Sequence, residues 1–243
     1  MSVTFGRTIR DIVADDYRTA AVFQRYGLDF CCRGHRTVEE ACAESGLGSA
    51  VVLRDLEDAV ALPCIGCAPR YNDWTAVALI DHIVAKHHTF VRAQLPVIQA
   101  HARKVASVHG TRHPEMVQVA RLFEDVSAEM TSHLMKEEQI LFPYVVRLAT
   151  AAAAGAAAPR APFGPVEHPI AMLEAEHESA GNAMAEIRRL TCGYRVPDGA
   201  CGTYTVLLQE LAAFEEDLHQ HVHLENNILF PKAQRLEAER HRP

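Results

Sequence analysis

One eleven-residue pattern occurs twice in the chain and constrains its fold more than any other feature. It runs His133-Leu-Met-Lys-Glu-Glu-Gln-Ile-Leu-Phe-Pro143 and returns as His221-Val-His-Leu-Glu-Asn-Asn-Ile-Leu-Phe-Pro231, with a constant offset (221 − 133 = 88). In each copy a histidine precedes a glutamate, Glu137 or Glu225, by four residues. Residues four apart lie on one face of an α-helix. Two such helices facing each other would bring two imidazoles and two carboxylates to one point, which is the ligand set of a metal site.

The repeat extends to the helix before each copy. His88 and His177 are 89 residues apart, within one position of the same offset. Each half therefore offers a helix with one histidine, followed by a helix with His-x-x-x-Glu. This internal two-fold symmetry is what an antiparallel four-helix bundle needs to enclose two metal ions. We predict a dinuclear metal centre with six ligands: His88, His133, Glu137, His177, His221 and Glu225.

The chemistry of these donors favours iron. Four imidazoles and two bridging carboxylates leave about four of the twelve positions of two octahedral ions for other ligands. Imidazole with carboxylate suits non-haem iron, whereas a structural zinc site would more often recruit cysteine, and manganese stays open. Glu129 and Glu176 are candidate proton relays, with a solvated helix face as the alternative. We expect the remaining histidines near the motifs to lie behind the ligands or at the surface: His82, His87, His219 and His223.

Apolar periodicity predicts an all-α chain with a small N-terminal helical domain over residues 1–70 and an antiparallel four-helix bundle over 71–243. In the small domain, Thr8 should cap one helix that runs to Gly27, and Thr37-Val-Glu-Glu40 reads as a capping box for the next. Ser49 should cap a third helix. Pro143 and Pro231 should kink the bundle helices. The four long helical segments are expected at about 74–106, 113–149, 167–191 and 202–239.

Composition excludes several classes of function. The formal charge of −7 and the pI of about 6.0 leave no basic footprint for nucleic acid. No apolar run is long enough to span a membrane, and the N-terminus lacks the apolar core of a signal peptide. We therefore expect a cytoplasmic protein. The sequence fixes no oligomeric state, and a homodimer is compatible with it.

Seven cysteines in such a chain indicate reactive or metal-linked thiols rather than a disulfide scaffold. Cys31 and Cys32 are adjacent and lie next to Arg33 and His35, whose positive charge should lower a thiol pKa. They are predicted to relay a small species to the bundle by redox or nitrosation chemistry. The alternative is two small buried residues. Cys64-Ile-Gly-Cys67, in a turn-rich linker, is either a dithiol switch, half a metal site or without function.

Several segments of the chain resemble those of a known family. Tyr26-Gly-Leu-Asp-Phe-Cys-Cys32, Leu79-Ile-Asp-His-Ile83 leading to His88, and the two motif copies resemble the di-iron iron–sulfur cluster repair family (repair of iron centres). That family pairs an N-terminal domain carrying vicinal cysteines with a hemerythrin-like bundle. The resemblance covers nearly the whole chain. It implies two non-haem iron ions, bridged by an oxo group and by two glutamates, on the same six residues.

The chain departs from oxygen-carrying hemerythrins in two ways. Gly181 stands four residues after His177, where those proteins carry a second histidine. The last helix has His-x-x-x-Glu rather than His-x-x-x-x-Asp. Fewer nitrogen ligands make the irons more exposed and more labile, which disfavours a pure oxygen carrier.

The resemblance implies a protein of nitrosative and oxidative stress defence. Its expected partners are nitric oxide or another small diatomic ligand, and damaged iron–sulfur proteins that receive iron. A reduced iron pair could also couple two nitric oxide molecules, which would make the chain a nitric-oxide-reducing oxidoreductase. The alternative is a non-catalytic sensor or scavenger of nitric oxide or oxygen. Iron storage is disfavoured because the sequence carries no signal for a cage-forming interface.

Overall fold

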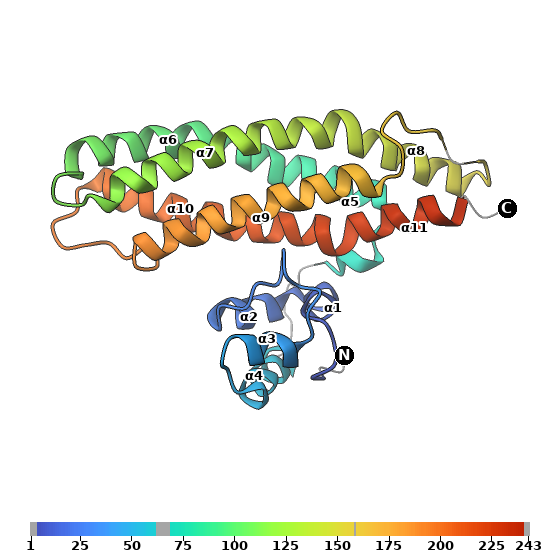
Figure 1. The fold of residues 1–243 in the computed structure, drawn as a ribbon, viewed down its shortest axis with the longest axis horizontal. Coiled ribbons are helices and arrows are strands. Elements are labelled where there is room, and N and C mark those ends of the chain that lie inside the picture. The colour runs from blue at the N-terminus through green and yellow to red at the C-terminus, as the bar shows by residue number, and fades with distance from the viewer. Residues whose placement is uncertain (1–3, 62–68, 158, 241–243) are drawn as a thin grey trace.

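The computed structural model describes residues 4–61, 69–157 and 159–240, and every regular element within them is a helix. One isolated bridge joins Thr8 to Thr37. The predicted all-α class, a small N-terminal helical domain followed by a helical bundle, is confirmed (Figure 1). None of the described helices is long and apolar enough to cross a membrane.

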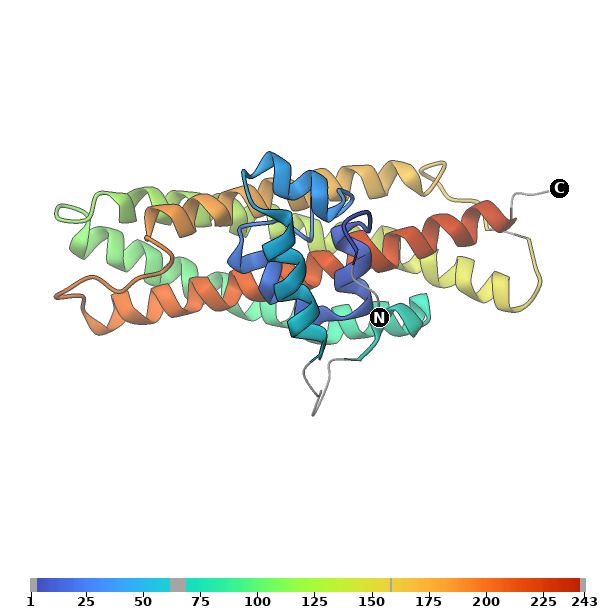
Figure 2. The same ribbon diagram turned by 90° about the horizontal axis from the view of Figure 1, so that it is seen from below.

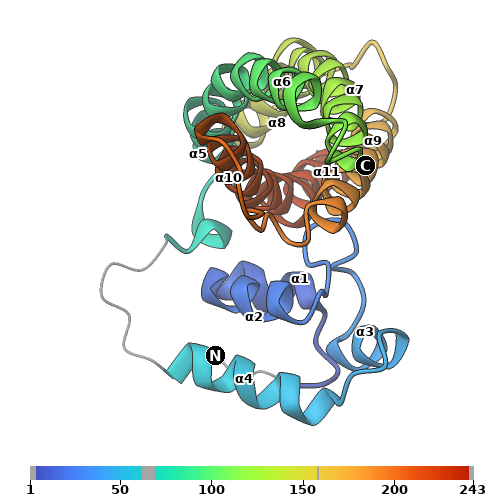
Figure 3. The same cartoon turned by 90° about the vertical axis from the view of Figure 1, so that its left-hand side faces the viewer.

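Four long rods, joined by loops, form the bundle. Figure 3 looks along them and shows that they surround a common axis. The rods are α5 (Ala76–His82) with η3 (Ile83–His88) and α6 (Thr89–His109); α7 (Glu115–Lys136) with η4 (Glu137–Leu141) and α8 (Phe142–Ala153); α9 (Glu167–Leu190); and α10 (Gly202–Leu224) with η5 (Glu225–Leu229) and α11 (Phe230–Arg240). All four predicted segments are present. The alanine-rich run extends the second rod by about one turn, as far as Ala153.

Two apolar cores fill the bundle, one on each side of a polar layer. One core packs α6, most of α7, the second half of α9 and most of α10, and it continues into the small domain. The other packs α5, α8, the start of α9 and α11. The predicted ligands lie along each rod between these cores. The hydrophobic effect therefore closes the bundle around a polar centre that it keeps dry.

A π-helical turn interrupts three of the rods at this polar layer. The N–H of Phe142 donates back to the carbonyl of Glu137, and the N–H of Phe230 does the same to Glu225. Kinks were expected at the prolines that follow, but the irregularity is a π-turn that starts at each glutamate. Proline lacks an N–H, so a wider turn before it limits the loss of hydrogen bonds. Proline is not the whole cause, because η3 has no proline directly after it.

The small domain holds η1 (Tyr17–Thr19) and four short helices: α1 (Ile9–Asp15), α2 (Ala20–Arg25), α3 (Val38–Glu44) and α4 (Ser49–Ala61). Thr8 caps α1, and Thr37 and Glu40 form the predicted capping box. The prediction of one helix up to Gly27 was wrong. Asp16 breaks it, because its side chain accepts from the N–H of Arg18 and caps η1 instead. Ser49 is the first residue of α4 rather than a cap before it.

The small domain lies across the middle of the bundle, against α9 and the fourth rod (Figures 1 and 2). It contacts the bundle through α1, which packs against η5, through Tyr17, whose ring centre lies 5.7 Å from that of His223, and through the loop after α2. Phe30 packs its ring on His219 and His223, with ring centres 5.8 and 6.0 Å apart. Asn227 of η5 donates to the carbonyl of Phe30 at 3.0 Å. The loop that carries the vicinal cysteines is thus fixed over the polar layer. The proposed linker, with Cys64 and Cys67, lies outside the described residues, so their predicted roles stay predictions.

Candidate metal centre

The structure brings all six predicted ligands together in the middle of the bundle. They form two groups, within each of which the ligand atoms lie within 4.8 Å of one another. All six side chains are at most 1% exposed. The two groups are His88, Glu137, His221 and Glu225, and His133, Glu137, His177 and Glu225. Both glutamates belong to both groups.

Each glutamate turns one oxygen toward each histidine pair. Glu137 places Oε2 3.4 Å from Nε2 of His88 and Oε1 3.3 Å from Nε2 of His133. Glu225 places Oε1 3.1 Å from Nε2 of His221 and Oε2 3.2 Å from Nε2 of His177. A carboxylate in this position is arranged to bridge two ions.

The unpaired atoms of the centre indicate that cations belong there. Both oxygens of Glu137 and Oε2 of Glu225 are buried without a hydrogen-bond partner. The Nε2 atoms of His133 and His177 face each other at 2.9 Å, and those of His88 and His221 at 3.2 Å. Lone pairs and carboxylate charge buried together cost free energy unless protons or metal ions lie between them. Imidazole and carboxylate donors suit a pair of non-haem metal ions, so the residues fit that group.

The pKa values of the buried histidines and glutamates also indicate that cations belong in the centre. Burial alone would lower the pKa of His88 and His133, but the carboxylates of Glu137 and Glu225 outweigh it and raise these pKa values to about 10 and about 9. Burial would raise the pKa of Glu225, yet His221 and its other imidazole neighbours hold it well below its usual range. The two buried carboxylates thus stay charged and demand positive charge beside them.

Three of the four ligand histidines are oriented from behind. The Nδ1 atom of His88 lies 2.6 Å from Glu138, that of His133 2.9 Å from Glu176, and that of His177 2.8 Å from Asn226. Such a bond fixes the ring and leaves Nε2 free to face a metal. Lys136 also bonds Glu176. Of the two proposed proton relays, Glu176 therefore contacts a ligand. Glu129 is exposed and accepts from Ser179 at 3.1 Å.

Glu138 and Asn226 were not among the predicted site residues, although the repeat contains the signal for both. Each directly follows the glutamate of its motif copy, so the two positions are also 88 apart. The symmetry fails at the fourth ligand. His87 occupies the place that corresponds to Glu176, stacks on His221 with ring centres 5.6 Å apart, and bonds Asp217 at 2.8 Å. Nδ1 of His221 has no hydrogen-bond partner among the described residues.

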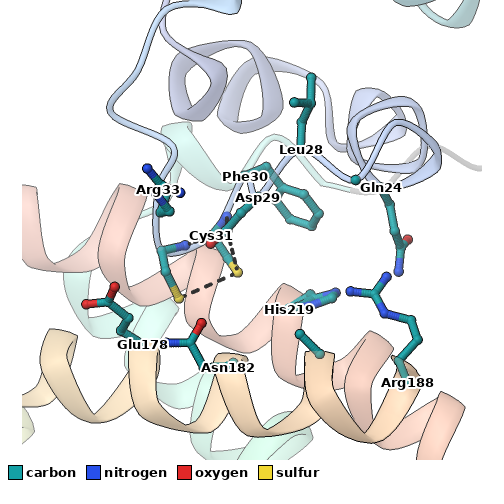
Figure 4. Close-up of a pocket in the computed structure, with 14 residues that line it drawn as sticks. Gln24, Leu28, Asp29, Phe30, Cys31, Arg33, Glu178, Asn182, Arg188 and His219 are labelled. Carbon is teal, nitrogen blue, oxygen red and sulfur yellow. Dashed lines mark hydrogen bonds between the residues drawn. The ribbon is translucent and has the colours of Figure 1, made fainter. Parts of the chain in front are cut away.

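The vicinal cysteines lie in the loop between α2 and α3, on the side of the small domain that faces α9 (Figure 4). The expectation that positive charge lowers the thiol pKa is wrong for Cys31. Its pKa is raised well above the usual range by the hydrogen bond with Cys32, by burial and by the charge of Asp29. Arg33 is directed to Glu44, 3.4 Å away. Nothing in these contacts tests the predicted relay role, which stays a prediction.

Gly181 is placed beneath these thiols. A Cβ atom added to it would lie 3.8 Å from Sγ of Cys32. The position at which oxygen-carrying hemerythrins are expected to carry a histidine therefore faces the cysteine loop.

Comparisons with known proteins find similar sequences along most of the chain. A family model described as the hemerythrin HHE cation binding domain matches residues 79–233, and one described as a domain of unknown function, ScdA_N, matches residues 6–60. A probable iron–sulfur cluster repair protein of Haemophilus influenzae is 36% identical, over 87% of this chain and 89% of its own length. The iron–sulfur cluster repair protein YtfE of an Enterobacter species is 32% identical, over 92% and 94%. The protein of that name from Cronobacter sakazakii is 33% identical, over 89% and 90%.

Proposed function

The chain belongs to the hemerythrin-like family of iron–sulfur cluster repair proteins, and from this membership we propose that it donates iron from a buried di-iron centre to damaged iron–sulfur proteins. The observation that carries the proposal is the pair of shared carboxylates. Glu137 and Glu225 each face both histidine pairs, so the chain can hold two ions side by side.

The residues around the centre have different roles in holding metal. The four histidines present Nε2 to the centre, and Glu138, Glu176 and Asn226 hold three of the rings in place. When bound, the iron pair supplies reducing electrons and open coordination positions for a small ligand. A carboxylate that changes from bridging two ions to contacting one would let an ion leave. The two apolar cores keep bulk water away from the layer.

Iron donation is tested by transfer to an acceptor. Protein loaded with ferrous iron without oxygen is mixed with an iron–sulfur protein that has lost its cluster, in the presence of sulfide. We expect the acceptor to recover its visible absorption and activity as the donor loses iron. The His133→Ala variant should load less iron and restore less of the acceptor. Iron that stays on the protein while the acceptor remains inactive would contradict the proposal.

Nitric oxide reduction is a second candidate, favoured by the closeness of the two ligand groups. Two molecules of nitric oxide, two electrons and two protons give nitrous oxide and water. Glu137 and Glu225, with the four histidines, would hold a pair of ions that supplies neighbouring binding positions for both molecules. Of the two predicted proton relays, Glu176 is the one that contacts a proposed ligand, His133.

Headspace analysis separates the candidates. Reduced, iron-loaded protein is given nitric oxide, and nitrous oxide is measured per pair of irons. Repeated turnover supports a reductase. A stable iron nitrosyl without gas product leaves donation or sensing, and the transfer assay then decides, because a sensor would keep its iron.

A further inference from the structure

A second group of potential metal ligands lies in the cysteine loop, outside the centre described above. Asp29, Cys31 and Cys32 each offer one ligand atom, and these three atoms lie within 4.8 Å of one another. The two Sγ atoms are 3.8 Å apart, and Oδ1 of Asp29 is 3.3 Å from Sγ of Cys31 (Figure 4).

These spacings match those of a tetrahedral ion. With metal–sulfur bonds of about 2.3 Å, tetrahedral angles put two sulfur ligands about 3.8 Å apart. With a metal–oxygen bond of about 2.1 Å, an oxygen ligand lies about 3.6 Å from each sulfur. The observed distance of 3.3 Å between Oδ1 of Asp29 and Sγ of Cys31 is only a few tenths of an ångström shorter than this oxygen–sulfur distance. We propose that Asp29, Cys31 and Cys32 form a separate, mononuclear site for a thiophilic divalent cation.

The loop is held in this shape before any ion arrives. Oδ1 of Asp29 accepts from the backbone N–H groups of Cys31 and Cys32, both at 2.9 Å, so the carboxylate is fixed beside the two thiols. Asn226 and Asn227 both donate to the carbonyl of Cys31 at 3.4 Å. A site whose ligands are fixed by their own backbone contacts loses little conformational entropy on binding.

The space around the thiols suits a cation. Cavities of about 230 and 390 Å³ are both lined by the two cysteines and by Glu178 of α9, whose carboxylate is available for a fourth position. Figure 4 shows Glu178 rising from α9 beside the thiols. Arg188, which lines the first cavity, is paired with Glu215 at 3.4 Å. Binding would exchange the two thiol protons for the ion, since thiolate is the ligand form.

The existence of this site does not rest on the proposed repair function. The identity of the ion bound in the cell does rest on that function, because a protein that donates iron would carry ferrous iron at this site.

Cobalt titration without oxygen tests the site, since Co²⁺ bound to thiolate gives a strong near-ultraviolet charge-transfer band that imidazole and carboxylate ligands do not give. The background protein carries Cys64→Ser and Cys67→Ser, which removes the other cysteine pair. We expect a thiolate band that saturates at about one ion per chain. Adding Cys31→Ser and Cys32→Ser should abolish it, and adding Asp29→Asn should weaken binding about tenfold or more.

Two control variants give the experiment its meaning. Cys42→Ser alters another buried thiol, in α3, and should leave the band unchanged. His133→Ala damages the dinuclear centre and should also leave it unchanged, so failure of the proposed function would not hide the site. A folded background protein with no thiolate band, or a band that survives loss of Cys31 and Cys32, would overturn the inference. Circular dichroism of each variant confirms that it is folded.

Discussion

Single side chains behind the ligands set how firmly the centre can hold metal. Asn226 is one of them, because its Oδ1 lies 2.8 Å from Nδ1 of His177. Its neighbour Asn227 also donates to the cysteine loop but bonds His223, which is not a proposed ligand. The two asparagines therefore separate an effect on the metal from an effect on the loop.

We expect Asn226→Ala to weaken iron binding about 10- to 100-fold, the usual cost of losing such a partner. The ring of His177 would lose the bond that orients it. Competition with chelators of graded affinity measures the change. Asn227→Ala is the matched control and should bind iron like the unaltered chain. Equal affinities for both variants would mean that His177 is held in place by packing alone.

Glu215 offers a test of buried charge away from the centre. It is 2% exposed, and its Oε1 lies 3.4 Å from Nε of Arg188 but accepts no hydrogen bond from the described residues. Burial raises its pKa, and the charge of Arg188 only partly offsets this. A carboxyl group with a raised pKa in the folded state is protonated more readily there than in the unfolded chain. At pH 7 its charge therefore lowers the stability of the fold.

Glu215→Gln should accordingly raise the free energy of unfolding at pH 7. The gain should shrink as the pH falls toward and below the ordinary carboxyl pKa of 4.5, where both states of the unaltered chain are protonated. Urea unfolding at pH 7 and pH 4 measures it. Glu186 is the control, since Arg189 lowers its pKa, and Glu186→Gln should not stabilise. A gain that is the same at both pH values would contradict the explanation.

The helices themselves were largely predictable, and the π-turns were not. Apolar residues at the helical period marked all four rods, and the repeat selected the six residues that converge. A π-turn differs from an α-turn by one residue per hydrogen bond and leaves composition unchanged. The break at Asp16 was missed for a similar reason. A side-chain cap there competes with a helix that the apolar pattern would otherwise continue.

The π-turn η4 sets the register between the ligands of α7 and the buried face of α8. Ile140 in this turn is 48% exposed, whereas Phe142 and Val145 beyond it are buried. Deleting Ile140 would force the turn toward α geometry. Either Glu137 or the apolar face of α8 would then be rotated away from its partners.

We expect deletion of Ile140 to lower the free energy of unfolding by more than about 2 kcal/mol, as loss of core packing does. Ile140→Ala is the control and should change it by less than about 0.5 kcal/mol, because the side chain faces solvent. Denaturant unfolding of protein without metal measures both. A deletion variant as stable as the control would show that the π-turn is not needed for packing.

At the scale of the whole molecule, the sequence could not place the small domain on the bundle. The hydrogen bonds between them run from Asn226 and Asn227 to the backbone carbonyls of Phe30 and Cys31. Every residue has a backbone carbonyl, so the residue types do not show which carbonyl accepts a hydrogen bond. The nearness of Cys32 to Gly181 is likewise visible only once both domains are in place.

Phe30 is the side chain on which this docking depends most clearly. It is 3% exposed and contacts rings of both domains, Tyr17 on one side and His223 on the other. Phe30→Ala removes these contacts, a change that costs about 3–5 kcal/mol in a packed core. We expect the domains to separate more easily, so that calorimetry shows two thermal transitions and alkylation reaches Cys31 faster. Phe5, at 39% exposed, is the control. If Phe30→Ala and Phe5→Ala react alike, as followed by mass spectrometry of the cysteine peptide, the remaining contacts hold the domains together without this ring, among them Asn226, Asn227 and the packing of Tyr17 on His223.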